Sequence, residues 1–98
     1  MNDVVLGKTI HEIRELKEMT LLDVANKCGV SVPYLSLIEN GKRRLSLDRL
    51  EKISKALDIP LSIILFLAYE KEIIKDMNIE LYTALSSFVK NLVKEKTT

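Results

Sequence analysis

The densest run of charge in the chain is the tripeptide Lys42-Arg43-Arg44, which follows Asn40 in a predicted loop. Adjacent ammonium and guanidinium groups bind anionic oxygens, and the phosphates of a nucleic acid are an extended anion that such a run fits. The net charge is only +1, and residues 1–60 hold ten Lys or Arg against nine Asp or Glu. Affinity for such an anion must therefore come from the placement of the cations.

The residue types that other chemistry needs are scarce. The single cysteine, Cys28, permits no intrachain disulfide, and we interpret it as a small buried helix residue, with a redox sensor as the minor alternative. The single histidine, His11, has no His or Cys at ligand spacing, so we expect an ordinary surface histidine. The sequence contains no glycine-rich phosphate loop and no catalytic Cys–His or Ser–His–Asp set. We therefore predict neither an enzyme nor a bound metal or cofactor.

Residues 20–44 must position the cations, and they read as two short helices around a sharp turn. Thr20 and Asp23 have the spacing of a capping box for a helix over Leu21–Cys28. Gly29 follows where the chain turns, because glycine accepts a left-handed backbone without a Cβ penalty.

The second of these helices follows Ser31 and runs to Glu39. Ser31 supplies a capping hydroxyl, and Pro33 is tolerated in the first turn because the N–H it lacks has no helical partner. Ala25 on the first helix is small at the point where the two helices cross closely. The side chains left outward are those of Ser31, Val32, Pro33, Ser36 and Leu37, with Tyr34 at the edge.

This combination resembles the phage-repressor helix-turn-helix family, also called Cro/CI-type or xenobiotic-response-element type. The matching elements are Ala25, Gly29-Val30-Ser31, Tyr34-Leu35-Ser36 and Ile38-Glu39-Asn40-Gly41-Lys42-Arg43, flanked by Gly7-Lys8, Ile10, Arg14, Leu50, Ile53, Ala56, Leu57 and Ile59. The resemblance covers roughly residues 6–67. It implies an all-α, five-helix lambda-repressor-like DNA-binding domain, which we place at residues 1–68, followed by an additional C-terminal amphipathic helix.

In the family, the second helix of the motif enters the major groove of double-stranded DNA. The resemblance implies a base-facing set that consists of Ser31, Val32, Pro33, Ser36 and Leu37. It implies a set facing the DNA backbone that consists of Tyr34, Asn40, Lys42, Arg43, Arg44 and Lys27.

Two positions depart from the family pattern. Many members carry glutamine where this chain has Leu21, and Gln, Lys or Arg where it has Leu37. Bidentate reading of guanine or adenine is then unavailable from the reading face. We predict modest specificity that favours thymine-containing steps, through apolar contacts with thymine methyl groups and contacts from two serine hydroxyls.

Further helices complete the predicted domain. Their expected ranges are residues 6–17, after a short lead at residues 1–5; residues 47–57, capped by Ser46; and residues 61–77, with a bend near Asn78. Arg14 in the first of them has two interpretations. In the family that this chain resembles, the matching arginine usually supports the fold through local ion pairs and capping, and we prefer that interpretation over a phosphate contact.

Residues 69–98 form the predicted C-terminal extension, with an amphipathic helix over residues 79–95. Leu81, Leu85, Phe88 and Leu92 recur at spacings of four, three and four. This stripe either folds back on the preceding helix and completes the core of the monomer, or pairs with its copy. We predict the second, a homodimer, as a helical bundle or coiled coil.

The resemblance implies a sequence-specific transcriptional regulator, acting as a dimeric repressor that occludes a palindromic operator. The alternative is a helix-turn-helix scaffold for protein partners, which would bind them through exposed Leu21, Leu22 and Leu37. An antitoxin would instead bind its toxin through the exposed end of the last helix. A phage or mobile-element regulator, an antitoxin and a restriction–modification controller all remain open. We expect no small-molecule ligand, because no ligand-sized second domain is present.

The sequence also bears on location. Residues 1–5 have no basic start or long apolar stretch, so we predict no signal peptide. The apolar run at residues 61–69 is nine residues long, against about 20 for a membrane-spanning helix. We therefore predict a cytoplasmic protein with no membrane partner.

Overall fold

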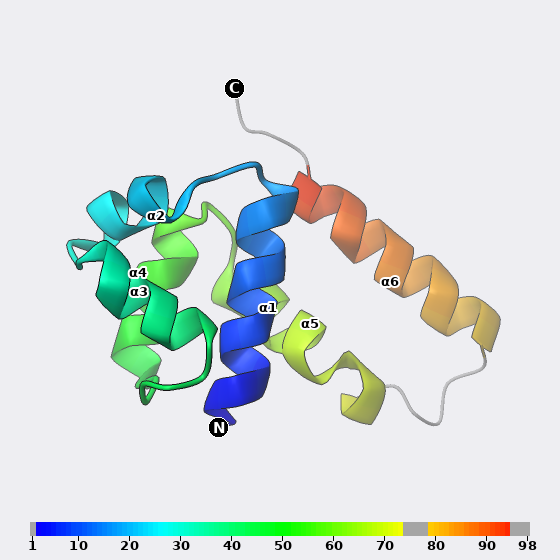
Figure 1. Cartoon of the computed structure of the whole chain (residues 1–98). Coiled ribbons are helices and arrows are strands. Elements are labelled where there is room, and N and C mark those ends of the chain that lie inside the picture. Colours follow the sequence, from blue (N-terminus) through cyan, green and yellow to red (C-terminus); the bar gives the residue numbers. More distant parts are fainter. Residues whose placement is uncertain (1, 74–78, 95–98) are drawn as a thin grey trace.

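Helices account for all the regular structure in the residues that the computed structural model describes, which are 2–73 and 79–94 (Figure 1). They are α1 (Asp3–Leu16), α2 (Leu21–Cys28), α3 (Val32–Glu39), α4 (Leu47–Ala56), α5 (Leu61–Ile73) and α6 (Ile79–Lys94). The predicted all-α fold, with five helices and an additional C-terminal one, is confirmed. Across the described ranges, no helix combines the length and apolar character that a bilayer crossing requires.

The first helix begins earlier than the apolar spacing predicts. Asn2 caps it, since its Oδ1 accepts the N–H groups of Val4 and Val5 at 3.0 and 3.2 Å. The expected irregular lead over residues 1–5 is therefore wrong, because a polar cap adds a turn that apolar periodicity does not register. This added turn has a use. Asp3 Oδ1 accepts the backbone N–H of Leu45 at 2.9 Å, which ties the loop after α3 to α1.

The caps of α2 are those that the sequence predicts. Thr20 Oγ1 accepts the Asp23 N–H at 3.0 Å, and Asp23 Oδ2 accepts the Thr20 N–H at 2.9 Å. These bonds to Thr20 lower the pKa of the Asp23 carboxyl, because they stabilise its charged form. Gly29 ends the helix in the left-handed conformation, at φ +71°. Both ends of α2 are therefore set by local chemistry.

The third and fourth helices are also capped as predicted. Ser31 Oγ accepts the N–H of Tyr34 at 3.2 Å, and Ser46 Oγ accepts that of Arg49 at 3.1 Å. Gly41 adopts φ +73° directly after α3, so the chain leaves the helix in a left-handed turn. The basic loop therefore starts at a defined point.

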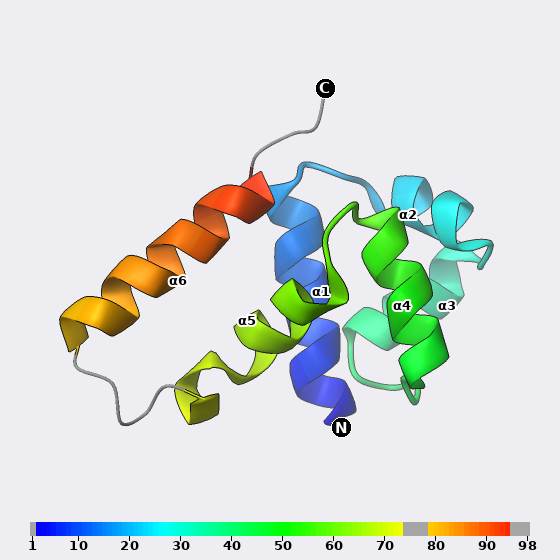
Figure 2. The same cartoon turned by 180° about the vertical axis from the view of Figure 1, so that it is seen from behind.

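The core surrounds α1, which packs against α3, α5 and α6 (Figure 2). Its fully or nearly fully buried apolar side chains come from every helix. They are Leu6, Ile10, Ile13, Val24, Ala25, Leu35, Ile38, Leu45, Leu50, Ile53, Ala56, Leu57, Ile64 and Val93. Val93 belongs to α6, so the C-terminal helix shares this core.

The fifth helix is irregular at Tyr69, where φ is −122° and ψ is 18°. The predicted domain boundary after residue 68 falls at this point. The Tyr69 hydroxyl accepts the backbone N–H of Asn2 at 3.1 Å, which links the irregular turn to the start of α1. The predicted end of this helix at residue 77 and the bend at Asn78 lie outside the described residues.

The sixth helix meets the domain through a face next to the predicted stripe. Ser86, Val89 and Val93 are its buried residues, and Ser86 Oγ donates to Glu70 Oε2 at 3.1 Å. Phe88 and Leu92 are 61% and 44% exposed, Leu81 is exposed too, and Leu85 is partly buried. The helix thus folds back on α1 and α5, as in the alternative that it completes the monomer core. The residues that it buries there, however, are Ser86, Val89 and Val93 rather than the predicted stripe. Because Ser86 and Val89 have smaller side chains than Phe88 and Leu92, this face lets α6 pack closer to α1 and α5.

Gly7 sits where α1 crosses the end of α3. A Cβ built on Gly7 would collide with the carbonyl oxygen of Ile38 and lie 3.0 Å from that of Glu39. Both obstacles are backbone atoms, which cannot move aside as a flexible side chain can. Glycine is therefore required for the contact between α1 and α3.

We expect Gly7→Ala to lower the free energy of unfolding by about 2 kcal/mol, as overpacking typically does. An unobstructed Gly→Ala change inside a helix would instead add about 1 kcal/mol, so the collision decides the sign. Thermal unfolding followed by circular dichroism measures the effect, with Lys8→Ala at the exposed neighbouring position as the control. A Gly7→Ala protein that melts at or above the wild-type temperature would contradict the close contact.

Candidate nucleic-acid interface

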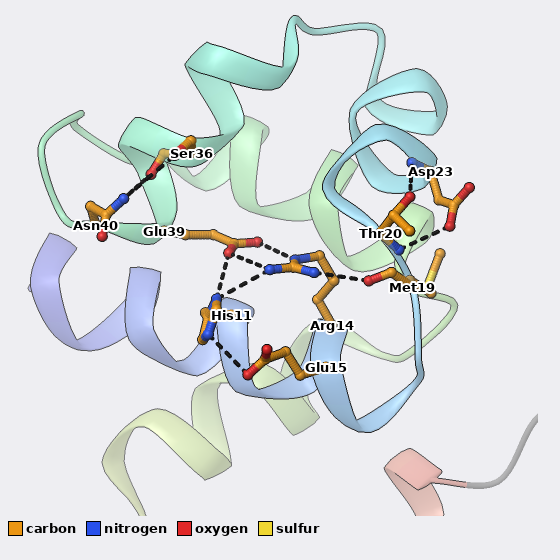
Figure 3. Close-up of polar contacts among 9 residues, drawn as sticks. All are labelled: His11, Arg14, Glu15, Met19, Thr20, Asp23, Ser36, Glu39 and Asn40. Atoms are coloured by element: carbon orange, nitrogen blue, oxygen red, sulfur yellow. Dashed lines mark hydrogen bonds and ion pairs between the residues drawn. The ribbon is translucent and has the colours of Figure 1, made fainter.

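A buried ion pair joins α1 to the last turn of α3. Arg14 Nε donates to Glu39 Oε2 at 2.7 Å, and Arg14 Nη2 donates to Glu39 Oε1 at 3.0 Å (Figure 3). The two side chains are only 11% and 5% exposed. This bidentate geometry is the strong form of such a pair, and the bonds to Glu39 raise the pKa of Arg14. The orientation of α3 is therefore linked directly to α1.

Arg14 also closes the end of its own helix. Its Nη1 donates to the carbonyl oxygen of Met19 at 2.9 Å, just before the cap of α2 (Figure 3). The preferred interpretation of Arg14, support of the fold by ion pairing and capping, agrees with these contacts. The partner, however, is Glu39, 25 residues away rather than local.

His11 is not the ordinary surface histidine that the sequence predicts. Its Nδ1 lies 2.7 Å from Glu39 Oε1 and 3.2 Å from Arg14 Nη2, and its Nε2 lies 3.0 Å from Glu15 Oε1 (Figure 3). The prediction considered metal ligands alone. The signal that was present is the helical spacing, since His11, Arg14 and Glu15 share one side of α1. His11 is thus part of the polar network beneath α3.

The predicted base-facing residues lie along α3 but differ in access. Ser31 and Pro33 are exposed, and Leu37 is 39% exposed. The Ser31 oxygen already accepts the Tyr34 N–H, but its own O–H can still donate. Val32 is partly buried against the core, so only part of its side chain is available to a ligand.

Ser36 and Asn40 occupy the edge of α3 that faces α1. Asn40 Nδ2 donates to the Ser36 carbonyl oxygen at 2.8 Å and lies 3.5 Å from Ser36 Oγ (Figure 3). A shallow groove beside them is lined also by Lys8, His11 and Leu21, and by the buried pair. Asn40 is thus held by the helix end, and Leu21 lies within the groove rather than fully outside.

The predicted cations are accessible. Lys42, Arg43 and Arg44 are exposed in the loop after α3, and Lys27 is exposed on α2. The Arg43 guanidinium lies 5.1 Å from the centre of the Tyr34 ring. The cluster therefore starts beside the outer edge of α3.

Arg49 is a member of this surface that sequence reasoning missed. It comes from the first turn of α4, and its guanidinium lies 5.0 Å from the centre of the Tyr34 ring. Fifteen positions separate Arg49 from Tyr34 in the sequence, and no local motif relates the two. They come together because α3 and α4 both pack against α2.

Cys28 lies at the end of α2, as predicted, but it is partly rather than fully buried. Its Sγ lies 3.9 Å from the Lys52 carbonyl oxygen, and burial raises the pKa of the thiol. In the part of the chain that the structure describes, no three His, Cys, Asp or Glu side chains are grouped to hold a metal ion.

Two short helices around a glycine turn, with an exposed second helix and cations beside it, define a helix-turn-helix DNA-binding protein. Comparison with known proteins agrees. The model of the family described as Helix-turn-helix matches residues 10–64, more than half of the chain. This chain belongs to that family, in its Cro/CI-type branch, and the family consists of DNA-binding transcription regulators rather than enzymes.

Individual relatives give the same result. The control protein C.MunI from Mycoplasma sp is 41% identical over 75 residues, which are 74% of this chain and 100% of that protein. An uncharacterized HTH-type transcriptional regulator, Rv0474 from Mycobacterium tuberculosis, is 42% identical over 53 residues, or 54% of this chain. The chain spans only 38% of the length of that relative.

A solved structure supports the whole fold. The crystal structure of the clp gene regulator ClgR from Corynebacterium glutamicum matches with a TM-score of 0.69 and 26% identity. The match covers 87% of this chain and 90% of that one.

We expect Glu39→Gln to lower the free energy of unfolding by about 3 kcal/mol, because it leaves the buried Arg14 without its counter-charge. Arg14→Met combined with Glu39→Leu removes both charges and is expected to cost less than Glu39→Gln alone. Urea denaturation measures both.

The exposed pair of Lys52 and Asp48, 3.6 Å apart, supplies the control. Lys52→Gln there should change the free energy of unfolding by less than about 1 kcal/mol. Equal losses for the buried and the exposed change would show that burial gives the Arg14–Glu39 pair no special weight.

Proposed function

We propose that this protein is a sequence-specific transcription regulator that binds a palindromic operator as a homodimer and represses by occlusion. The observation that carries the proposal is the exposed face of α3, held to α1 by the Arg14–Glu39 pair and flanked by Lys42, Arg43 and Arg44. A major groove admits one such helix. Repression by occlusion needs no further activity, because a protein bound to the operator blocks other proteins from the same DNA.

Base reading in this proposal rests on few groups. Pro33 and Leu37 offer apolar contacts to thymine methyl groups, with the accessible part of Val32. The hydroxyls of Ser31 and Ser36 supply hydrogen bonds to base edges. None of these pairs with a base in the bidentate manner of arginine or glutamine, which supports modest specificity for thymine-containing steps.

Backbone contacts supply most of the affinity. The proposed phosphate-binding groups are Tyr34, Asn40, Lys42, Arg43, Arg44 and Lys27. Such contacts fix the register of a protein on DNA without reading the sequence.

The proposed dimer uses the outer face of α6. Phe88 and Leu92 are large apolar side chains left in solvent there, together with Leu81 and part of Leu85. A second copy covers this stripe with the same stripe, as twofold symmetry requires. The two α3 helices would then meet half-sites about 34 Å apart, one turn of the duplex.

Among the roles that the sequence left open, a controller is supported by the match to C.MunI over the full length of that control protein. The protein-binding alternative keeps some support from Leu22, which is 57% exposed. Its predicted patch is smaller than expected, because Leu21 is partly buried.

Binding to the DNA upstream of its own gene tests the main proposal. We expect affinity to fall steeply with salt, and Arg43→Ala/Arg44→Ala to reduce the slope of log K against log salt by about 2, because each lost phosphate contact removes about 0.9. Fluorescence anisotropy at several salt concentrations measures this. Lys90→Ala/Lys94→Ala removes the same charge from α6 and serves as the control. If neither this DNA nor a randomised pool is bound, the protein-binding alternative gains.

A single charge on α6 tests the dimer. We expect Phe88→Glu to produce a monomer that keeps the helix content of the wild type by circular dichroism, since Phe88 is 61% exposed and contributes little to the monomer core. Sedimentation velocity measures the assembly state. Ser87→Glu, at an exposed position on another side of α6, should remain dimeric. A wild-type protein that stays monomeric at micromolar concentration and still binds a palindrome tightly would refute the dimer.

A further inference from the structure

We propose that Tyr34, Arg43 and Arg49 act as one phosphate clamp, in which the ring of Tyr34 positions both guanidiniums and Arg49 is itself a contact to the DNA backbone. The inference rests on the proposed function and deepens it. It adds Arg49 to the interface and gives the ring of Tyr34 a role, whereas the sequence placed Tyr34 only in the set that faces the DNA backbone.

The clamp is assembled from three separate segments. Tyr34 comes from α3, Arg43 from the loop after it and Arg49 from the first turn of α4. The two guanidinium carbons lie 5.1 and 5.0 Å from the centre of the same ring. Both distances are within the range of a cation–π contact. The ring therefore restrains both arginines before any ligand arrives.

Stacking on a ring leaves the donors of arginine available. The guanidinium is planar, so contact through its face keeps the N–H groups at its edge free for a bidentate anion. Within the residues that the structure describes, neither Arg43 nor Arg49 forms an ion pair with a carboxylate. Two like charges beside one ring repel each other, and a bound anion lowers that repulsion.

The position of Tyr34 selects the phosphate backbone as the anion. At about 100° per residue, Tyr34 lies at one edge of the outward arc of α3, Ser36 and Asn40 lie at the other, and Pro33 and Leu37 lie between. A helix that inserts Pro33 and Leu37 into the major groove has a phosphate strand on each side. The edge that carries Tyr34 then faces one strand, together with both arginines.

The backbone of Arg49 is held in place by α4. Its own backbone N–H donates to the capping oxygen of Ser46 at 3.1 Å, and α4 is anchored by the buried Leu50 and Ile53. Arg49 is partly buried whereas Arg43 is exposed. Arg49 is thus the less mobile of the two arginines and sets the place where the phosphate is held.

The test is DNA binding by anisotropy between 50 and 200 mM salt, with wild type, Arg49→Gln, Tyr34→Phe and Tyr34→Leu. Arg49→Gln is expected to reduce the slope of log K against log salt by about 1, and Lys52→Gln, one turn along α4, to leave it unchanged. Tyr34→Phe keeps the ring and removes only the hydroxyl, so it should lose less affinity than Tyr34→Leu. Tyr34→Leu should weaken binding about tenfold.

Coupling separates a positioning role from a merely structural one. In the Tyr34→Leu background, Arg43→Ala and Arg49→Gln should each cost less affinity than in the wild type, because the ring that restrains them is gone. Circular dichroism melts establish that each variant is folded.

Three results would overturn the clamp. These are an unchanged salt slope in Arg49→Gln, equal damage from Tyr34→Phe and Tyr34→Leu, and strictly additive losses. The second would make the hydroxyl the contact rather than the ring. If the wild type does not bind DNA at all, the proposed function fails as well. The first titration, with the wild type alone, separates this outcome from the other three.

Discussion

The buried contact between the Arg14 guanidinium and the Glu39 carboxylate is the constraint on which the surface of this protein depends. A charge removed from water costs several kcal/mol unless its partner is well placed, so α3 cannot rotate or slide without separating two buried charges. The bidentate geometry, at 2.7 and 3.0 Å, adds direction to this constraint. A hydrophobic pair could hold the helices equally tightly, but it would tolerate more than one orientation. The exposed face of α3 is therefore presented in one orientation.

Other contacts with α1 extend this constraint to the whole interface. The absent Cβ of Gly7 lets α1 touch the carbonyl end of α3, and Asp3 holds the backbone of Leu45 after the basic loop. The start and end of the segment that carries the cations are thus both attached to one helix. The Tyr34 ring then lies beside the Arg43 guanidinium, so α3 itself contacts the first part of the cationic loop.

Local chemistry explains what could be predicted from the sequence. The caps at Thr20, Ser31 and Ser46 and the glycine turns depend on residues within three or four positions, so their patterns are visible in one stretch. Contacts between distant segments were missed for the opposite reason. His11 beside Glu39, and Arg49 beside Tyr34, follow from helix packing that no spacing encodes. Asn2 was missed because a polar cap interrupts no apolar pattern. Of the candidate site, the motif residues were predictable, and their mutual positioning was not.

The sixth helix illustrates why an apolar stripe does not by itself say what covers it. Two stripes run along it one residue apart, and the one with smaller side chains, through Ser86, Val89 and Val93, meets the core. If the stripe with the larger side chains faced the core instead, α6 would lie farther from α1 and α5. Phe88 and Leu92 therefore remain outside, where exposed apolar area of this kind costs about 25 cal/mol for each Å² that could be covered. A second copy can cover the outer stripe and leave the inner one in place, because the inner one already packs on its own domain. The proposed dimerisation through the outer stripe would therefore require no rearrangement of the helix-turn-helix, and each α3 would enter the dimer already oriented by its Arg14–Glu39 pair.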